Sequence, residues 1–204
     1  MKPYYKLFGD IPDGDYDGCV AFLEKELRFE LTAAYEQEFV DAEVRHFNDA
    51  ARRLYTLYFD CTEDYESTDI YSRAARVVFV YGRSAAGTKE RDSKRMRQFL
   101  GTFKNQPEYV GYDKGHFIAH CNDGQIDQNL YPQLKELNRG LSPQGKLFRS
   151  MERYLQRNEG VFYFVRPIYN DLTWIPHQID FGIFTKEKGL LLNRFDNRKP
   201  NDAV

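Results

Sequence analysis

Apolar residues recur at helical spacing through the first third of the chain. Between residues 20 and 58 they stand mostly three or four positions apart, which is the spacing of amphipathic helices. Asp17 and Thr32 are candidate N-caps, because their side chains can accept hydrogen bonds from the first turn of a helix. We therefore expect successive helices over residues 17–60, followed by an acidic connecting loop at residues 60–69.

A different pattern begins after residue 72, where short β-branched and aromatic runs predict buried strands. The expected strands cover residues 76–81, 115–120, 161–168 and 179–185, and the expected helices cover residues 92–99, 134–138 and 143–158. The last helix should start at Pro143 and carry Leu147, Met151, Tyr154 and Leu155 on one apolar side. This order implies an α+β fold, in which a helical segment at residues 1–72 precedes the domain at residues 73–204.

Charge is divided unevenly along the chain, although the net charge is only −2. Residues 1–72 hold 7 Lys or Arg against 17 Asp or Glu, residues 73–157 hold 16 against 8, and residues 158–204 hold 6 against 6. Such a split is typical of a protein in which a segment that binds nucleic acid is joined to an acidic segment. The solvated faces of ordinary helices would explain the acidic balance equally well.

Composition excludes several classes of protein. The 204 residues include 42% hydrophobic ones, enough for a buried core, and no window approaches the roughly 20 apolar residues of a membrane helix. The start of the chain lacks the apolar run of a signal peptide. Cys19, Cys61 and Cys121 are too widely spaced for a disulfide framework or a zinc knuckle. We expect a soluble protein, with no membrane partner, that is cytoplasmic as synthesised unless a dedicated secretion system exports it.

Residues 112–140 carry the residue types that phosphodiester hydrolysis requires. The reaction needs an activated water and stabilisation of negative charge on the phosphate and the leaving oxygen. The imidazole of His116 can serve as the general base, because its pKa lies near neutral pH. Mg²⁺ can supply the stabilisation, and because it retains several waters, one amide oxygen such as that of Asn138 suffices to hold it.

Other polar residues could support this chemistry. Glu152 on the following helix could hold a metal-bound water or orient Asn138. Candidate ligands for substrate phosphates are the cationic residues Arg83, Lys114, Arg139, Arg149 and Arg153. We do not expect zinc at His116, His120 and Cys121, because no fourth ligand stands at suitable spacing.

Three short motifs stand close together in this segment. They are Asp-Lys-Gly-His at 113–116, Asn-Leu-x-Pro-Gln at 129–133 and Leu-Asn-x-Gly at 137–140. Together they resemble the motifs of the DNA/RNA non-specific endonucleases of the ββα-metal (His-Me finger) superfamily. The phrase Gly-His-Phe-Ile-Ala-His at 115–120 is similar to the bacterial branch found among secreted nucleases and polymorphic toxin modules. The resemblance covers roughly residues 75–185.

The resemblance implies a ββα-metal nuclease core with a mixed or antiparallel sheet. It implies a metal-dependent, sequence-non-specific endonuclease that acts on DNA, RNA or both, with His116 as general base. Asn138 is then the direct ligand of Mg²⁺, for which Mn²⁺ is the alternative, and Glu152 is the acidic helix residue beside the metal. Asn129 and Asp113 would support the site, and an inhibitor or immunity protein is a candidate partner.

Two departures from the family pattern leave an alternative open. Lys114 replaces the commoner Arg, and the stretch from Asn138 to Glu152 is longer than usual. A catalytically degenerate nuclease fold that binds a protein partner through its acidic helices would fit both features. The acidic segment could also fold over the basic surface and damp its activity, or it could simply complete the core.

Overall fold

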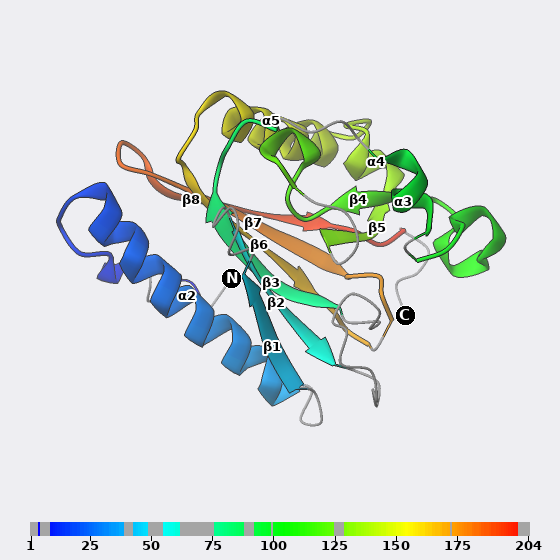
Figure 1. Ribbon diagram of the computed structural model, residues 1–204, viewed down its shortest axis with the longest axis horizontal. Helices are drawn as coiled ribbons and strands as arrows, with labels where there is room; N and C mark the ends of the chain where they lie inside the picture. The colour runs from blue at the N-terminus through cyan, green and yellow to red at the C-terminus, as the bar shows by residue number, and fades with distance from the viewer. Residues whose placement is uncertain are drawn as a thin grey trace.

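A six-stranded antiparallel sheet runs through the middle of this computed structural model (Figure 1). The structure describes residues 4, 9–38, 43–48, 55–61, 76–87, 92–98, 100–124, 129–171 and 173–199. In spatial order the strands are β1 (Glu43–Asn48), β2 (Tyr55–Cys61), β3 (Val77–Arg83), β6 (Phe162–Ile168), β7 (Gln178–Thr185) and β8 (Gly189–Asp196). Both strands before residue 72 therefore belong to the same sheet as β3, β6, β7 and β8.

The remaining elements lie on the two sides of this sheet. A separate hairpin consists of β4 (Tyr112–His116) and β5 (Leu130–Leu134). The helices are α2 (Tyr16–Glu38), α3 (Ser93–Gln98), α4 (Lys135–Asn138) and α5 (Pro143–Arg157), and the 3-10 turns are η2 (Phe103–Asn105), η3 (Pro107–Tyr109) and η4 (His120–Asn122). The α+β class predicted from the sequence is confirmed. No helix within the described ranges is long and apolar enough to cross a bilayer.

Alternation along the strands separates two cores, one on each face of the sheet. On β6, Phe162 and Phe164 pack with Leu23 and Leu27 of α2, whereas Tyr163 and Val165 pack with residues of α5 and the hairpin. Successive side chains of a strand point to opposite faces, so a strand covered on both sides carries apolar residues at every position. Figure 1 shows α2 on one side of the sheet and α4, α5, β4 and β5 on the other.

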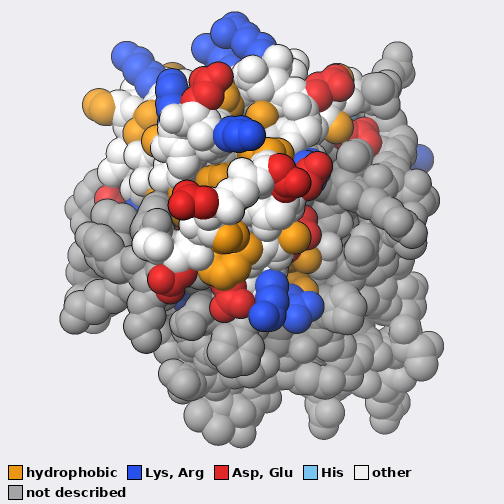
Figure 2. Space-filling view, turned by 90° about the vertical axis from the view of Figure 1, so that its left-hand side faces the viewer, with side chains coloured by type: hydrophobic (Ala, Val, Ile, Leu, Met, Phe, Trp, Pro, Cys, Tyr) orange, Lys and Arg blue, Asp and Glu red, His pale blue; other side chains and the backbone are white. Residues whose placement is uncertain are grey.

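The charge split of the sequence coincides with these two faces. Helix α2 carries six Asp or Glu and two Lys or Arg, whereas α5 carries four Lys or Arg and only one Glu. Figure 2 shows acidic side chains scattered over one side of the molecule, with several Lys and Arg side chains at its upper edge and others among the acidic ones. Because α2 packs on the sheet face opposite α5, it completes the core and does not cover the basic helix.

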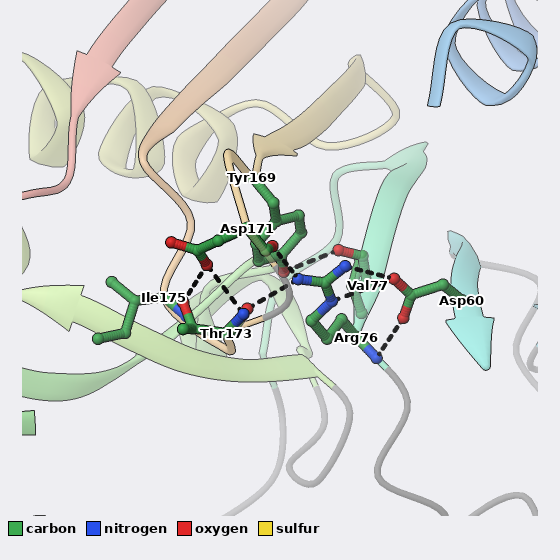
Figure 3. Close-up of polar contacts among 7 residues, drawn as sticks. All are labelled: Asp60, Arg76, Val77, Tyr169, Asp171, Thr173 and Ile175. Carbon is green, nitrogen blue, oxygen red and sulfur yellow. Dashed lines mark hydrogen bonds and ion pairs between the residues drawn. The ribbon is translucent and has the colours of Figure 1, made fainter. Parts of the chain in front are cut away.

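A buried ion pair fastens the loop after β6 to strands β2 and β3 (Figure 3). Arg76 and Asp60 are fully buried, and the guanidinium donates to Asp60 Oδ2 at 2.8 and 3.0 Å. The same guanidinium donates to the carbonyls of Asp171 and Thr173 at 2.6 and 2.8 Å and lies 4.3 Å from the ring centroid of Tyr169. Tyr169 in turn donates to the carbonyl of Val77 at 3.0 Å. This single cation therefore joins three parts of the chain.

The expectation of helices throughout residues 17–60 is wrong beyond Glu38, because β1 and β2 are strands. Both faces of β2 are covered: Tyr55 and Leu57 lie in the core on the α5 side, and Tyr58 lies in the core on the α2 side. A strand buried on both faces has a continuous apolar run, which periodicity alone does not distinguish from a helix. Most of the predicted acidic loop, residues 62–69, lies outside the described residues.

The other elements agree more closely with the sequence. The strands at β3, β6 and β7 and the helices at α3, α4 and α5 are confirmed, whereas β5 and β8 were not predicted. The strand expected over residues 115–120 lies earlier, at Tyr112–His116. On α5, Phe148 is buried, while Leu147 and Tyr154, which were expected on the apolar side, are 43% and 39% exposed.

Replacing one partner of the buried ion pair should strongly destabilise the fold. Asp60→Ala should lower the free energy of unfolding by about 3–5 kcal/mol, because Arg76 would stay buried without its carboxylate. The control is Asp17→Ala, which removes an ion pair with Arg83 from an 82% exposed side chain and should cost within about 1 kcal/mol. Urea denaturation followed by circular dichroism measures both, and equal small losses would contradict the structural role of Arg76.

Candidate active site

His116 is the last residue of β4 and faces the start of β5. The register pairs His116 with Leu130 and Gly115 with Tyr131, and only 7% of His116 is exposed. The ring of His116 lies 6.4 Å from that of His120, at the start of η4. Gly115 is needed here because a Cβ atom would lie 2.1 Å from Oε1 of Gln133, whose side chain crosses the strand. The Gly-His pair of the motif therefore has a packing reason in this hairpin.

Asn129 extends the pairing of the hairpin beyond its last backbone pair. Its side-chain Oδ1 accepts from the N–H of Ile118 at 2.9 Å, and its Nδ2 donates to the Ile118 carbonyl at 2.9 Å. The backbone N–H of Phe117 donates to the Asn129 carbonyl at 3.0 Å. Both polar atoms of this buried side chain therefore fix the chain just after His116, so Asn129 positions the strand that carries the imidazole.

Asp113 holds the end of α4 against β4. Arg139 donates to its carboxylate at 2.6 and 2.9 Å, and Nδ2 of Asn138 donates to Oδ2 at 3.2 Å. Burial raises the pKa of Asp113, but the hydrogen bonds from Arg139 and Asn138 outweigh it and leave the pKa below its ordinary value. Asp113 is therefore a carboxylate at neutral pH. It orients the Asn138 amide by accepting a hydrogen bond from the amide nitrogen.

Glu152 lies on α5 in a poorly solvated position, with 20% of its side chain exposed. Burial raises its pKa to about 7, while the charges of Arg149 and Arg153 oppose that rise. Arg149 Nε stands 3.7 Å from the carboxylate and a second nitrogen of Arg149 donates to the Asn138 carbonyl at 3.1 Å. The Glu152 carbonyl faces Nδ2 of Asn122 at 3.5 Å.

These contacts lead from β4 to η4, and the facing rings of His120 and His116 lead back to β4, so we call the whole set the ring of contacts. It runs from Asp113 through Asn138, Arg149 and Glu152 to Asn122 of η4. Turn η4 also contains His120, whose ring faces that of His116. The structure thus brings together Asp113, His116, Asn138, Arg139, Arg149 and Glu152 of the predicted site.

Two predicted substrate ligands have other contacts. Arg83 donates to Asp17 at 2.8 Å and lies over the ring of Tyr16, so it points toward α2 on the other face of the sheet. The ammonium of Lys114 donates to three backbone carbonyls near α3. Arg153 is exposed on α5, one residue from Glu152.

Three buried polar side chains beside the ring were not predicted to take part. The hydroxyl of Tyr131, Oδ1 of Asn122 and Nε2 of Gln133 are buried without a hydrogen-bond partner among the described residues. Tyr131 and Asn122 both interact with Glu152. Leaving such groups unsatisfied costs free energy, so their presence is typical of a site that holds ordered water or an ion. The only signal in the sequence was their inclusion in or near the Asn-Leu-x-Pro-Gln and Cys-Asn-Asp-Gly segments.

Comparison of the sequence with known protein families identifies the family of this chain. The family described as DNA/RNA non-specific endonuclease has a model that matches residues 56–188, more than half of the 204 residues. The chain belongs to this family. The match begins in β2 and includes the hairpin, η4, α4 and α5, so the ring of contacts described above is the candidate active site of an endonuclease.

Three solved nuclease structures are similar to this endonuclease. The Sda1 nuclease with bound zinc ion is 14% identical with a TM-score of 0.45, covering 77% of this chain and 84% of that one. An extracellular endonuclease has 16% identity and a TM-score of 0.43, with coverage of 78% and 92%. An extracellular nuclease has 15% identity and a TM-score of 0.40, with coverage of 79% and 87%. None of the curated proteins matches the endonuclease.

The residues of the endonuclease fit a metal that needs few protein ligands. Among the described residues, no group of three or more His, Cys, Asp or Glu side chains is placed to hold a metal ion. Asn138 commits its amide nitrogen to Asp113, and no described residue donates to its Oδ1. One oriented amide oxygen, with the carboxylate of Glu152 on the same ring of contacts, suits a cation such as Mg²⁺ that keeps most of its waters.

A cavity of about 590 Å³ lies at the other end of the hairpin. It is lined by Leu134, Glu136, Leu137, Ser142, Pro143, Gln144, His177, Asp196, Arg198 and Lys199. None of the predicted site residues lines it. The endonuclease therefore carries its candidate catalytic residues outside this cavity.

The raised pKa of Glu152 should make the stability of the metal-free endonuclease fall as pH rises between about 4.5 and 7. In that window the folded state binds the proton and the unfolded state has released it. Glu152→Gln should then raise the free energy of unfolding at pH 8 by at most about 3 kcal/mol and change it little at pH 5. Urea denaturation in EDTA measures this, with exposed Glu159→Gln as the control. An equal effect of Glu152→Gln at both pH values would contradict the raised pKa of Glu152.

Proposed function

We propose that this endonuclease hydrolyses phosphodiester bonds of DNA, RNA or both, with His116 as general base and a single Mg²⁺ held by Asn138. The observation that supports this best is the ring of contacts from Asp113 through Asn138, Arg149 and Glu152 to η4. It gathers a base, a metal-binding amide and an acidic residue around one short hairpin, in the residue types that this hydrolysis requires.

Each residue then has a separate duty. His116 takes a proton from the attacking water, and Asn129 holds the strand that carries it by its two bonds to Ile118. Asp113 orients Asn138, and Glu152 would help to hold a divalent cation or a water beside it. A bound divalent cation supplies charge stabilisation at the phosphate and the leaving oxygen, a role for which Mn²⁺ is the alternative to Mg²⁺.

Cationic residues at this site would contact substrate phosphates. Arg139 and Arg149 are partly exposed while they hold Asp113 and Asn138, so each has guanidinium surface left for the substrate. Contacts to the phosphate backbone carry no base information, which agrees with cleavage of low sequence preference. An inhibitor or immunity protein would need to cover the same basic side, and an acidic surface would suit it.

A digestion assay tests the proposal. Wild type should cleave plasmid DNA, RNA or both in Mg²⁺ and not in EDTA, and His116→Ala should cleave at least about 100-fold more slowly because the general base is gone. His177→Ala, a histidine outside the ring of contacts, should cleave as wild type. If wild type shows no metal-dependent cleavage, the alternative of a binding module that has lost activity is favoured. If His116→Ala cleaves as fast as wild type, the role of His116 is wrong.

A further inference from the structure

A basic arm projects from the strand that carries His116. We define the basic arm as residues 92–98 and 100–106, which include α3 and η2. Lys94, Arg97 and Lys104 of this arm are exposed, and none of their side chains forms a hydrogen bond or ion pair within the described part of the chain. Helix α3 buries no side chain, so apolar packing of this helix does not hold the arm in place.

Lys114 holds the arm from β4. Its ammonium donates to the carbonyls of Met96 at 2.9 Å, Arg97 at 3.0 Å and Gly101 at 2.6 Å. It also lies 5.2 Å from the ring centroid of Phe103. A cation at the last carbonyls of a helix is favourable, because those carbonyls lack partners within the helix and carry partial negative charge. All three donor positions of an ammonium are thus used within the protein.

The turn between α3 and η2 has an unfavourable backbone that these polar contacts maintain. Leu100 has a φ of 58° and Gly101 a φ of 66°, and Nε2 of Gln106 donates to the Leu100 carbonyl at 2.9 Å. A left-handed backbone is uncommon for a residue such as leucine and persists where the surroundings enforce it. The turn brings the Gly101 carbonyl onto Lys114, so the shape of the arm depends on that lysine.

We propose that the basic arm binds the phosphate backbone of the nucleic acid being cleaved, and that Lys114 is a positioning residue for the arm. This inference rests on the proposed function. Lys114 and His116 are two residues apart on β4, so they lie on one face about 7 Å from each other. The arm therefore starts within a few nucleotides of the reacting phosphate. Its exposed, unpaired cations suit a polyanion, and Lys114 acts on the substrate only through them.

Salt-dependent binding to DNA tests the arm. In a His116→Ala background, a triple variant with Lys94, Arg97 and Lys104 changed to Gln should bind labelled single-stranded DNA at least about 10-fold more weakly at low salt. The slope of log affinity against log salt should fall by about 2–3, as expected for three lost phosphate contacts. The control triple variant changes Lys25, Lys186 and Lys188, which are exposed on α2 and on the turn between β7 and β8. Equal slopes for the two triple variants would overturn the proposal, even where the wild type cleaves normally.

Variants of Lys114 separate positioning from direct contact. Lys114→Met should raise the KM for cleavage with little change in kcat, and it should add almost nothing to the DNA-binding loss of the arm triple variant. Lys114→Arg should also bind DNA more weakly than wild type, because a planar guanidinium does not match three converging carbonyls. A direct phosphate contact predicts the opposite for Lys114→Arg, since arginine binds phosphate at least as well. Additive losses, or full binding by Lys114→Arg in a correctly folded protein, would overturn the positioning role.

Discussion

The geometry of the candidate site depends on one helix that packs against both sheets. A hairpin of two strands is marginally stable in water, so β4 and β5 need another surface to hold their shape. Helix α5 supplies it by burying Phe148, Met151 and Leu155 in the same core as Tyr131 of the hairpin. The polar side of the same helix places Arg149 and Glu152 at the site. The rotation of α5 about its own axis therefore sets both which of its side chains pack in the core and which lie at the site.

Local signals predicted helix α5 more accurately than the strands. Pro143 starts α5 as predicted, and Ser142 caps it by accepting from the N–H of Gly145. The motif residues are close in sequence, so a hairpin and a helix suffice to gather them. Strands β1 and β2 are different, because their identity as strands depends on pairing with β3 and on burial of both faces. No short window of sequence contains that information.

The direction in which charged side chains point could not be predicted from their type. Arg83 and Lys114 were expected at substrate phosphates because they are cations within or near the motif. The structure turns Arg83 toward Asp17 on α2, 66 positions away in the chain, and Lys114 toward carbonyls 13 to 18 positions away. The contacts of Asn129 could not be predicted either, because both its side-chain polar atoms hydrogen-bond to the backbone of Ile118. Contacts of this kind are set by the fold, and their partners cannot be predicted from the motif.

The claim that the β4–β5 hairpin, α4 and α5 build a single metal site is tested most directly by calorimetry. Titration of the wild type with MnCl₂ or MgCl₂ should show one binding site. Asn138→Ala should abolish that site, whereas Asn105→Ala, which changes an exposed asparagine of η2, should keep it. Wild type that binds neither ion, or Asn138→Ala that binds as wild type does, would contradict the account.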